Sequence, residues 1–273
     1  MSRRMWLLAA LAACAVVLSA QDPTQWTRSQ QEEFLREAKV VDSTKAPGGI
    51  TGSSQLTLER NGVRHDAHFQ SINDRKTSFQ SAQGTELNFR DSYKYNVAAY
   101  RLDQLLGFNF VPTSVERKVP QGLGAVTWWV DDVLMVEKDR WKKKIEAPDK
   151  DRWNQQMRRI RVLNELVYNT DANLGNFVID KAWKIWSVDF TRGFRTVRSI
   201  RDKKNLEIID RECVGALKAL TSENVTAQLE DVLTKSEIRG IVERRDLILE
   251  FFDERAAKLG EGVVLYDWVV ANS

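Results

Sequence analysis

The sequence is short of cysteine, of long apolar runs and of charge of a single sign. It has only two cysteines, Cys14 and Cys213, which excludes a framework of several disulfides. Its longest apolar run ends at Leu18 and is shorter than the roughly 20 residues that span a bilayer as a helix, which excludes a polytopic membrane protein. The 41 lysines and arginines nearly balance the 38 aspartates and glutamates, so the charge gives little support to nucleic-acid binding, and we expect no nucleic-acid partner.

What remains is the composition of an ordinary globular protein. Apolar residues make up 42% and charged residues 29% of the 273 positions, and nine tryptophans predict a large, aromatic-rich core. The length fits one large domain or two small ones.

Residues 1–20 have the parts of a secretory signal peptide. They combine a basic pair at Arg3 and Arg4, a short apolar run and a small-residue exit at Ser19 and Ala20. The sequence therefore predicts export to the periplasm or the extracellular space.

Two alternative cleavage sites fit this signal peptide. Cleavage after Ala20 would remove Cys14 and leave Cys213 as the remaining thiol. Alternatively, the segment from Leu11 to Cys14 resembles a bacterial lipobox, in which Cys14 would be lipidated and would attach the protein to a membrane. Neither reading allows an intrachain disulfide.

The first half of the remaining chain is rich in predicted strands. Period-two alternation predicts an antiparallel sheet of three strands in residues 38–73, with an Asn-Gly hairpin turn. Residues 74–86 are polar and are expected to form a mobile loop. Apolar spacing of three and four residues then predicts a helix that ends at Gly107, and two more strands follow in residues 111–137.

The second half is mainly helical. A long apolar stripe predicts a helix over residues 151–169, two short strands follow, and only helices are expected after Leu206. We therefore expect an α+β fold: a smaller lobe of antiparallel sheet plus helix in residues 38–137, and a mainly helical lobe in residues 138–273. Residues 21–37 would form a helical or flexible segment before them.

Three polar residues of the second half form a candidate site. Asp171 lies in the loop after the long helix, Asn176 begins the first short strand, and Asp189 ends the second. A hairpin would bring Asn176 and Asp189 to one edge of the sheet. Their oxygens are hard ligands suited to Mg²⁺, and Asp171 could orient or deprotonate a substrate hydroxyl.

This arrangement resembles the catalytic loop and metal-binding motif of the protein-kinase-like superfamily. Asp171 and Asn176 have the D-x-x-x-x-N interval, and Asp189-Phe190 begins a D-F-G motif with Thr191 in place of glycine. The absence of the HRD triplet is similar to the atypical branches: phosphatidylinositol 3-/4-kinases, the HipA toxin kinase and the secreted Golgi kinases. The chain also resembles exported acidobacterial proteins of unassigned function.

The resemblance implies a two-lobed protein-kinase-like fold that binds ATP, or another nucleotide, with Mg²⁺ or Mn²⁺. Asp171 would be the catalytic base, and Asn176 and Asp189 would hold the metal. Two positions depart from the pattern, because Gln70 stands where the phosphate-binding lysine is expected and Asn96 where its glutamate partner is expected. We expect these two amides to face each other.

The nucleotide's phosphates would then need other partners. A substitute cation could come from Lys94, Arg75 or Lys76, with no reason in the sequence to choose among them. Backbone amides near Gly49 and Gly52, together with Ser53, could cover a phosphate, although a plain turn explains this stretch equally well.

Several remaining charged residues have ordinary explanations. His65 and His68 lie three apart on one strand, so they face opposite sides and make a poor metal pair. Arg192 and Arg195 could contact phosphate or form salt bridges to the helical lobe. The basic clusters at 140–144 and 158–161 predict a solvated face, or a surface for an acidic substrate or for anionic lipid.

The sequence thus favours an exported atypical kinase-like protein. It would transfer a phosphoryl group to a hydroxyl of an unidentified protein or small molecule. The alternative is a non-catalytic kinase-fold module, a pseudokinase whose site has been turned to another ligand. Retention of Asp171, Asn176 and Asp189 favours the enzyme, and the change at Gln70 and Asn96 favours the module.

Overall fold

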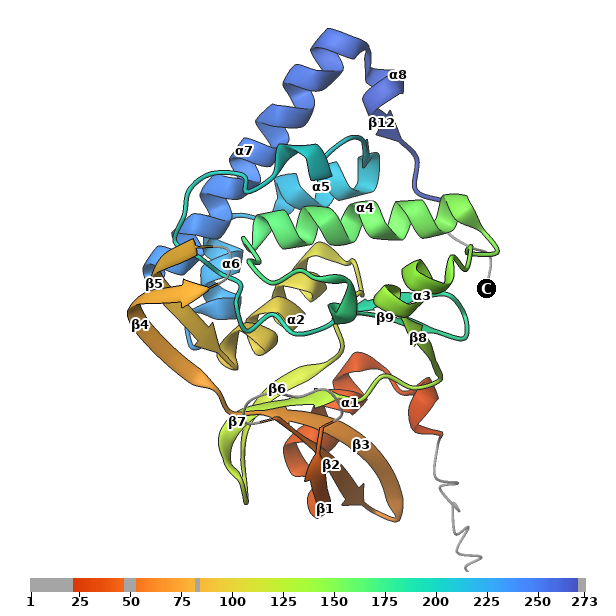
Figure 1. Cartoon of the computed structure of the whole chain (residues 1–273), viewed down its shortest axis with the longest axis vertical. Helices are drawn as coiled ribbons and strands as arrows, with labels where there is room; N and C mark the ends of the chain where they lie inside the picture. Colours follow the sequence, from red (N-terminus) through yellow and green to blue (C-terminus); the bar gives the residue numbers. More distant parts are fainter. Residues whose placement is uncertain (1–21, 47–52, 82–83, 270–273) are drawn as a thin grey trace, which may run out of the picture.

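The computed structural model describes residues 22–46, 53–81 and 84–269 (Figure 1). The expected signal peptide and the glycines Gly49 and Gly52 lie outside the described residues. The sheet-rich lobe contains, in chain order, η1 (Pro23–Gln25), α1 (Arg28–Glu37), β1 (Lys39–Lys45), β2 (Ser53–Arg60), β3 (Val63–Gln70), β4 (Asn73–Ser81), β5 (Gly84–Ser92), α2 (Lys94–Leu106), β6 (Ser114–Val119) and β7 (Gly122–Trp128).

The rest of the chain is mainly helical and lies on the other side of α2 (Figure 1). No helix in the described ranges is both long and apolar enough to cross a bilayer. The elements are β8 (Val133–Val136), α3 (Glu137–Lys143), α4 (Lys150–Leu166), η2 (Leu174–Asn176), β9 (Phe177–Asp180), β10 (Ile185–Ser187), η3 (Lys203–Asn205), β11 (Ile209–Asp210), α5 (Arg211–Ala219), α6 (Ser222–Leu229), α7 (Lys235–Leu259), α8 (Glu261–Val264) and β12 (Leu265–Tyr266). The expected α+β class is confirmed.

The sheet-rich lobe is built on a five-stranded antiparallel sheet in the order β1-β2-β3-β7-β6. One face of this sheet is apolar and is covered by α1, whose Phe34 and Leu35 are fully buried against it. The period-two alternation of β2 and β3 therefore sends one set of side chains to α1 and the other set to the opposite face. The residues packed with α1 are Leu56, Leu58, Ala67, Phe69, Val115, Val119, Val126 and Trp128.

A two-stranded hairpin, β4–β5, occupies the stretch that the sequence suggested would be a mobile loop. The prediction was wrong because it was based on the charge of this segment and on its near lack of apolar residues. Its two phenylalanines, Phe79 and Phe89, stack with ring centroids 4.3 Å apart. Lys76 lies over both rings, so aliphatic and cationic groups complete a small cluster that hydropathy alone does not reveal.

The predicted strand over residues 125–137 is also split. β7 ends at Trp128 in the five-stranded sheet, whereas β8 pairs with β9 in a separate three-stranded sheet, β10-β9-β8. The acidic pair Asp131-Asp132 lies in the turn between them, and Asp132 has a φ of 51°. This turn moves the chain from one lobe to the other.

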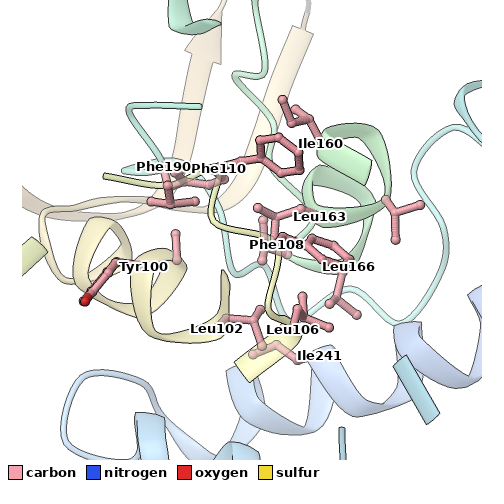
Figure 2. Close-up of a cluster of buried hydrophobic side chains, with 14 of the residues drawn as sticks. Tyr100, Leu102, Leu106, Phe108, Phe110, Ile160, Leu163, Leu166, Phe190 and Ile241 are labelled. Atoms are coloured by element: carbon pink, nitrogen blue, oxygen red, sulfur yellow. The ribbon is translucent and has the colours of Figure 1, made fainter. Parts of the chain in front are cut away.

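Helix α2 packs with the helical lobe in one large core. Figure 2 shows Leu102 and Leu106 of α2 beside Leu163 and Leu166 of α4, with Ile241 of α7 next to them. Gly107 ends α2 in the left-handed conformation with a φ of 66°, as the sequence predicts. Because α2 contributes to this core, it links the sheet to the helical lobe.

Candidate functional site

The loop after α4 is held in place by amide side chains that bond to its own backbone. Asn169 is buried, donates from Nδ2 to Oδ1 of Asn164 at 2.9 Å, and accepts from the backbone nitrogen of Asp171 at 3.0 Å. Local bonds of this kind fix irregular backbone without secondary structure. Asp171 is therefore presented from a well-defined loop.

The predicted hairpin is present: Asn176 pairs with Val188, the residue directly before Asp189. The backbone nitrogen of Val188 donates to the carbonyl of Asn176 at 2.9 Å. The Nδ2 of Asn176 in turn donates to the carbonyl of Asp171, also at 2.9 Å. This bond uses the amide nitrogen of Asn176 and not the oxygen that would ligate a cation. Asn176 is thus bonded to the backbone of Asp171 on one side and to that of Val188, the residue before Asp189, on the other.

Asp189 has an unusual backbone and an unfavourable electrostatic environment. Its φ is 59°, in the left-handed region that residues other than glycine seldom adopt. Surrounding protein raises the pKa of its carboxyl, and the nearby charge of Asp171 raises it further, although the side chain still reaches solvent. Thr191, in the position of the motif glycine, donates its hydroxyl to Oδ1 of Asp189 at 3.0 Å.

Asp91 is a residue of this region that the sequence did not identify. It lies near the end of β5, where the backbone nitrogen of Ser92 donates to the carbonyl of Thr191 at 2.9 Å. Burial raises the pKa of its carboxyl and the charge of Asp189 raises it too, while its Oδ1 is buried without a hydrogen-bond partner. An aspartate just before a helix is typical of an N-cap, so no local signal in the sequence indicates that Asp91 lies close to Asp189.

Arg192 and Arg195 bind the inserted hairpin. Glu86 of β5 pairs with Nη2 of Arg192 at 3.0 Å and with Nη2 of Arg195 at 2.6 Å. Arg195 also donates to the carbonyl of Arg90 at 2.7 Å, and the guanidinium of Arg192 lies over the ring of Phe89. The sequence offered phosphate or the helical lobe as partners, and the structure instead shows the hairpin.

The two amides at the lysine and glutamate positions do not form the expected pair. The Oε1 of Gln70 accepts from the backbone nitrogens of Ser71 and Ile72, at 3.0 and 3.1 Å. The Oδ1 of Asn96 accepts from the backbone nitrogen of Phe190 at 2.7 Å. Each oxygen thus has a different backbone partner, and Asn96 positions the residue next to Asp189.

A charged pair of reversed polarity lies nearby. Lys94 of α2 is 4.0 Å from Glu116 of β6, and the hydroxyl of Tyr93 donates to the same carboxylate at 2.9 Å. In protein kinases the lysine is on the sheet and the glutamate on the helix. Of the three substitute cations considered, Lys94 is the one beside the sheet face that carries Gln70, whereas Lys76 lies over the hairpin phenylalanines.

The face of the sheet opposite α1 is polar, and it is called the polar face below. Strand register aligns Gln70 with Ser53 on one side and with Ala125 and then Glu116 on the other. The next row joins Gln55, His68, Thr127 and Ser114, and a third pairs Thr57 with Asp66. Hydrogen bonds link several of these side chains: Ser53 with His68, Gln55 and Thr57 with Asp66, and Ser114 with Thr127.

His68 is a half-buried histidine of the polar face. Burial lowers the pKa of its imidazole to about 4, so the ring is neutral at pH 7. It shares a 2.7 Å hydrogen bond with Ser53, a residue expected to contact phosphate. A purine base is flat and largely apolar, and this face would offer it hydroxyl, amide and carboxylate groups.

The site residues suit a divalent cation. Two carboxylates with raised pKa values and an unpartnered buried oxygen on Asp91 are the groups that a bound cation would stabilise. Within the described ranges no three His, Cys, Asp or Glu side chains gather as a metal site. Mg²⁺ commonly uses one or two carboxylates, several waters and phosphate oxygens, which is compatible with Asn176 and Asp189 as protein ligands.

Comparison with known proteins places this geometry in context. Neither a protein-family model nor a curated protein sequence matches the chain. Solved structures do match: hydra Fam20 with sugar has a TM-score of 0.69 at 13% identity, and the match covers 89% of this chain and 93% of that one.

Two further structures are similar over most of the chain. The Golgi casein kinase with Mn/ADP bound has a TM-score of 0.60 at 13% identity, covering 90% of this chain and 80% of that one. The Helicobacter pylori proinflammatory kinase CtkA has a TM-score of 0.52 at 9% identity, covering 82% and 98%. The chain therefore has the fold of the atypical protein-kinase-like superfamily.

Proposed function

We propose that the protein is an exported, metal-dependent phosphotransferase that acts on a hydroxyl group. The observation that carries this proposal is the clustering of three residues: Asn176 bonds to the backbones of Asp171 and Val188, and the charge of Asp171 acts on the neighbouring Asp189. Asn176 and Asp189 would hold Mg²⁺ or Mn²⁺, which when bound neutralises charge on phosphate oxygens. A scaffold without chemistry has no need of all three residues.

Asp171 would act on the acceptor. Its carboxylate accepts from Nδ2 of Asn173 at 3.2 Å, which holds one oxygen in place. The other oxygen can orient an acceptor hydroxyl and take its proton. The acceptor would be a protein or a small molecule.

The phosphoryl donor would be ATP or another nucleotide. Support comes from the fold and from its similarity to the Golgi casein kinase with Mn/ADP bound. Lys94 would be the cation nearest to the donor's phosphates, because it lies beside the sheet face that also carries Gln70 and Ser53.

A second candidate function is a non-catalytic binding module. Two observations favour it: the oxygen of Gln70 is used by its own backbone, and the polar face does not resemble an apolar slot for a base. On this reading the same residues would bind a polar ligand or a partner without phosphoryl transfer.

Nucleotide-dependent melting decides between the two. We expect ATP with Mg²⁺ or Mn²⁺ to raise the melting temperature of the parent, and each component alone to raise it less. Asp189→Ala should abolish the shift. Asp171→Ala should keep the shift but lower phosphoryl transfer by roughly a hundredfold or more, as expected for loss of a general base.

Asp253→Ala serves as the matched control, because Asp253 is an exposed aspartate of α7 far along the chain from the site. It should behave like the parent in both assays. If the parent shows no shift with any of several nucleotides and either metal, the phosphotransferase proposal fails and the binding module is favoured.

A further inference from the structure

Helix α3 exposes a tryptophan among lysines. Trp141 is 69% exposed, the largest exposure of an aromatic side chain in the described ranges. Lys138 lies three residues before Trp141 and four before Lys142, the spacing at which side chains share one helix face. Lys143 and Lys144 follow at once, and all four lysines are exposed.

Glu137 and Arg140 anchor α3 firmly. Glu137 is buried and pairs with Arg140 through bonds of 2.5 and 2.8 Å, and Arg140 lies over the ring of Trp153. Arg140 also donates to the carbonyl of Ile145 at 2.6 Å. The charge of Arg140 is thus neutralised internally, whereas Lys138, Lys142, Lys143 and Lys144 have no ion pair within the described ranges.

Exposed apolar residues also lie on the elements that pack against α3. β8 runs directly into α3, and η2 packs against both. Val133 and Leu134 of β8 are 44% and 43% exposed, and Leu174 of η2 is 39% exposed. The set of Val133, Leu134, Lys138, Trp141, Lys142 and Leu174 is called the Trp141 patch below.

We propose that the Trp141 patch binds the anionic surface of a lipid bilayer. Tryptophan prefers the bilayer interface, where its ring is half in the acyl region, and lysine stems lie along apolar surface while their ammonium groups reach phosphate. Clustered lysines next to exposed aromatic and aliphatic side chains are typical of peripheral membrane helices. Protein–protein interfaces also favour tryptophan, but they are depleted in lysine, which makes an acidic protein the weaker candidate.

The location of the patch gives the contact a consequence. Leu174 lies three residues after Asp171 and two before Asn176, in the loop that presents the candidate catalytic residues. A bilayer against the Trp141 patch would therefore lie beside the loop, and acceptors attached to that surface would be the nearest ones.

Vesicle co-sedimentation tests the proposal. The parent should sediment with phosphatidylcholine vesicles that contain phosphatidylglycerol and far less with phosphatidylcholine alone. Binding should fall as NaCl is raised, because salt screens the lysine–phosphate attraction. Every variant shares the same N-terminal segment, so differences between variants report on α3.

Two variants and one control separate the contributions. We expect the double variant Lys138→Gln, Lys142→Gln to lower the partition coefficient by roughly tenfold or more, because each substitution removes one attraction between a lysine and anionic lipid. Trp141→Ala should lower it by roughly tenfold, and it should remove the fluorescence quenching by brominated lipid that we expect for the parent. Lys218→Gln with Lys235→Gln removes the same charge from α5 and α7, which should leave binding unchanged.

Several results would overturn the proposal. They are equal binding to the two vesicle types, equal binding by the patch and control variants, and binding to polyglutamate but not to vesicles, which would favour an acidic protein. The patch variants should keep the nucleotide-dependent melting shift of the parent. Loss of vesicle binding with that shift intact separates this proposal from the proposed function.

Discussion

At the scale of single residues, the surroundings of Gln70 would suit a lysine at this position better than the sequence suggested. Glu116 lies on the same row of the polar face, two strands away and thus about 10 Å across the sheet. A lysine at position 70 could extend toward this carboxylate, because its stem is flexible. The partner that sequence reasoning sought at Asn96 is present on the sheet.

We therefore predict that Gln70→Lys alone increases the melting shift given by nucleotide and metal. The new cation would stand near the phosphates and would be held by Glu116, so no change at Asn96 is needed. Gln55→Lys, which adds the same charge to the same face one row away, is the control. Equal shifts for the two variants would contradict the prediction.

His68 makes folding dependent on pH. Its pKa of about 4 lies below the usual 6.5, so between these values the unfolded chain binds more protons than the folded one. The free energy of unfolding should therefore fall as the pH drops from 6.5 toward 4. The free energy of unfolding above pH 6.5 should exceed that below pH 4 by at most about 3 kcal/mol on account of His68.

Urea unfolding of the parent and of His68→Gln, at several pH values between 4 and 7, measures this contribution. The difference between the two curves isolates His68 from Asp103. Burial raises the pKa of Asp103 to about 6, so it changes stability in the opposite direction over part of the same range. Parallel curves would show that His68 has an ordinary pKa.

At the scale of elements, the β4–β5 hairpin is fastened to the segment after Asp189. Glu86 carries both ion pairs, and its side chain is about one-quarter exposed, so each pair adds little to global stability. Their effect is local, because they tie Arg192 and Arg195 to a hairpin with few other contacts.

We predict that Glu86→Gln speeds hydrogen exchange of the hairpin amides and of residues 191–195, with a loss of global stability below about 1 kcal/mol. Glu212→Gln removes a carboxylate that also pairs with an arginine, Arg159, and it should leave these amides unchanged. Mass-spectrometric exchange on both variants makes the comparison. Exchange rates equal to those of the parent would mean that the phenylalanine stack holds the hairpin unaided.

The elements that could be predicted are those whose signal is local. β2 and β3 alternate clearly, and α2 has both an apolar stripe and a terminal glycine. The β4–β5 hairpin could not be predicted, because its stability depends on Arg192, about a hundred residues away. The same holds for the site: one hairpin joins Asn176 to Asp189, whereas Asp91 reaches Asp189 only through the tertiary fold.

At the scale of the whole molecule, the two lobes share a core. Phe190 is buried in the same cluster as α2, α4 and α7, next to Asp189 (Figure 2). Its backbone nitrogen is also bonded to Asn96 of α2. A change in the packing of Phe190 therefore acts on both lobes at once.

We predict that the described lobes unfold in a single cooperative transition, and that Phe190→Ala lowers its free energy by about 3–5 kcal/mol. Circular dichroism and tryptophan fluorescence should give coincident curves. Phe34→Ala, in the separate core between α1 and the sheet, should destabilise the same transition to a similar extent. Two resolved transitions in the parent would contradict the shared core.

The polar face also constrains the heat of binding. A ligand that settles there displaces water from hydroxyl, amide and carboxylate groups, and it covers little apolar surface. The change in heat capacity on binding should then be small, because a large negative change comes from apolar burial. Calorimetry at several temperatures would thus report, from the slope alone, whether the ligand lies against Gln70 and His68 or against the aromatic core beneath.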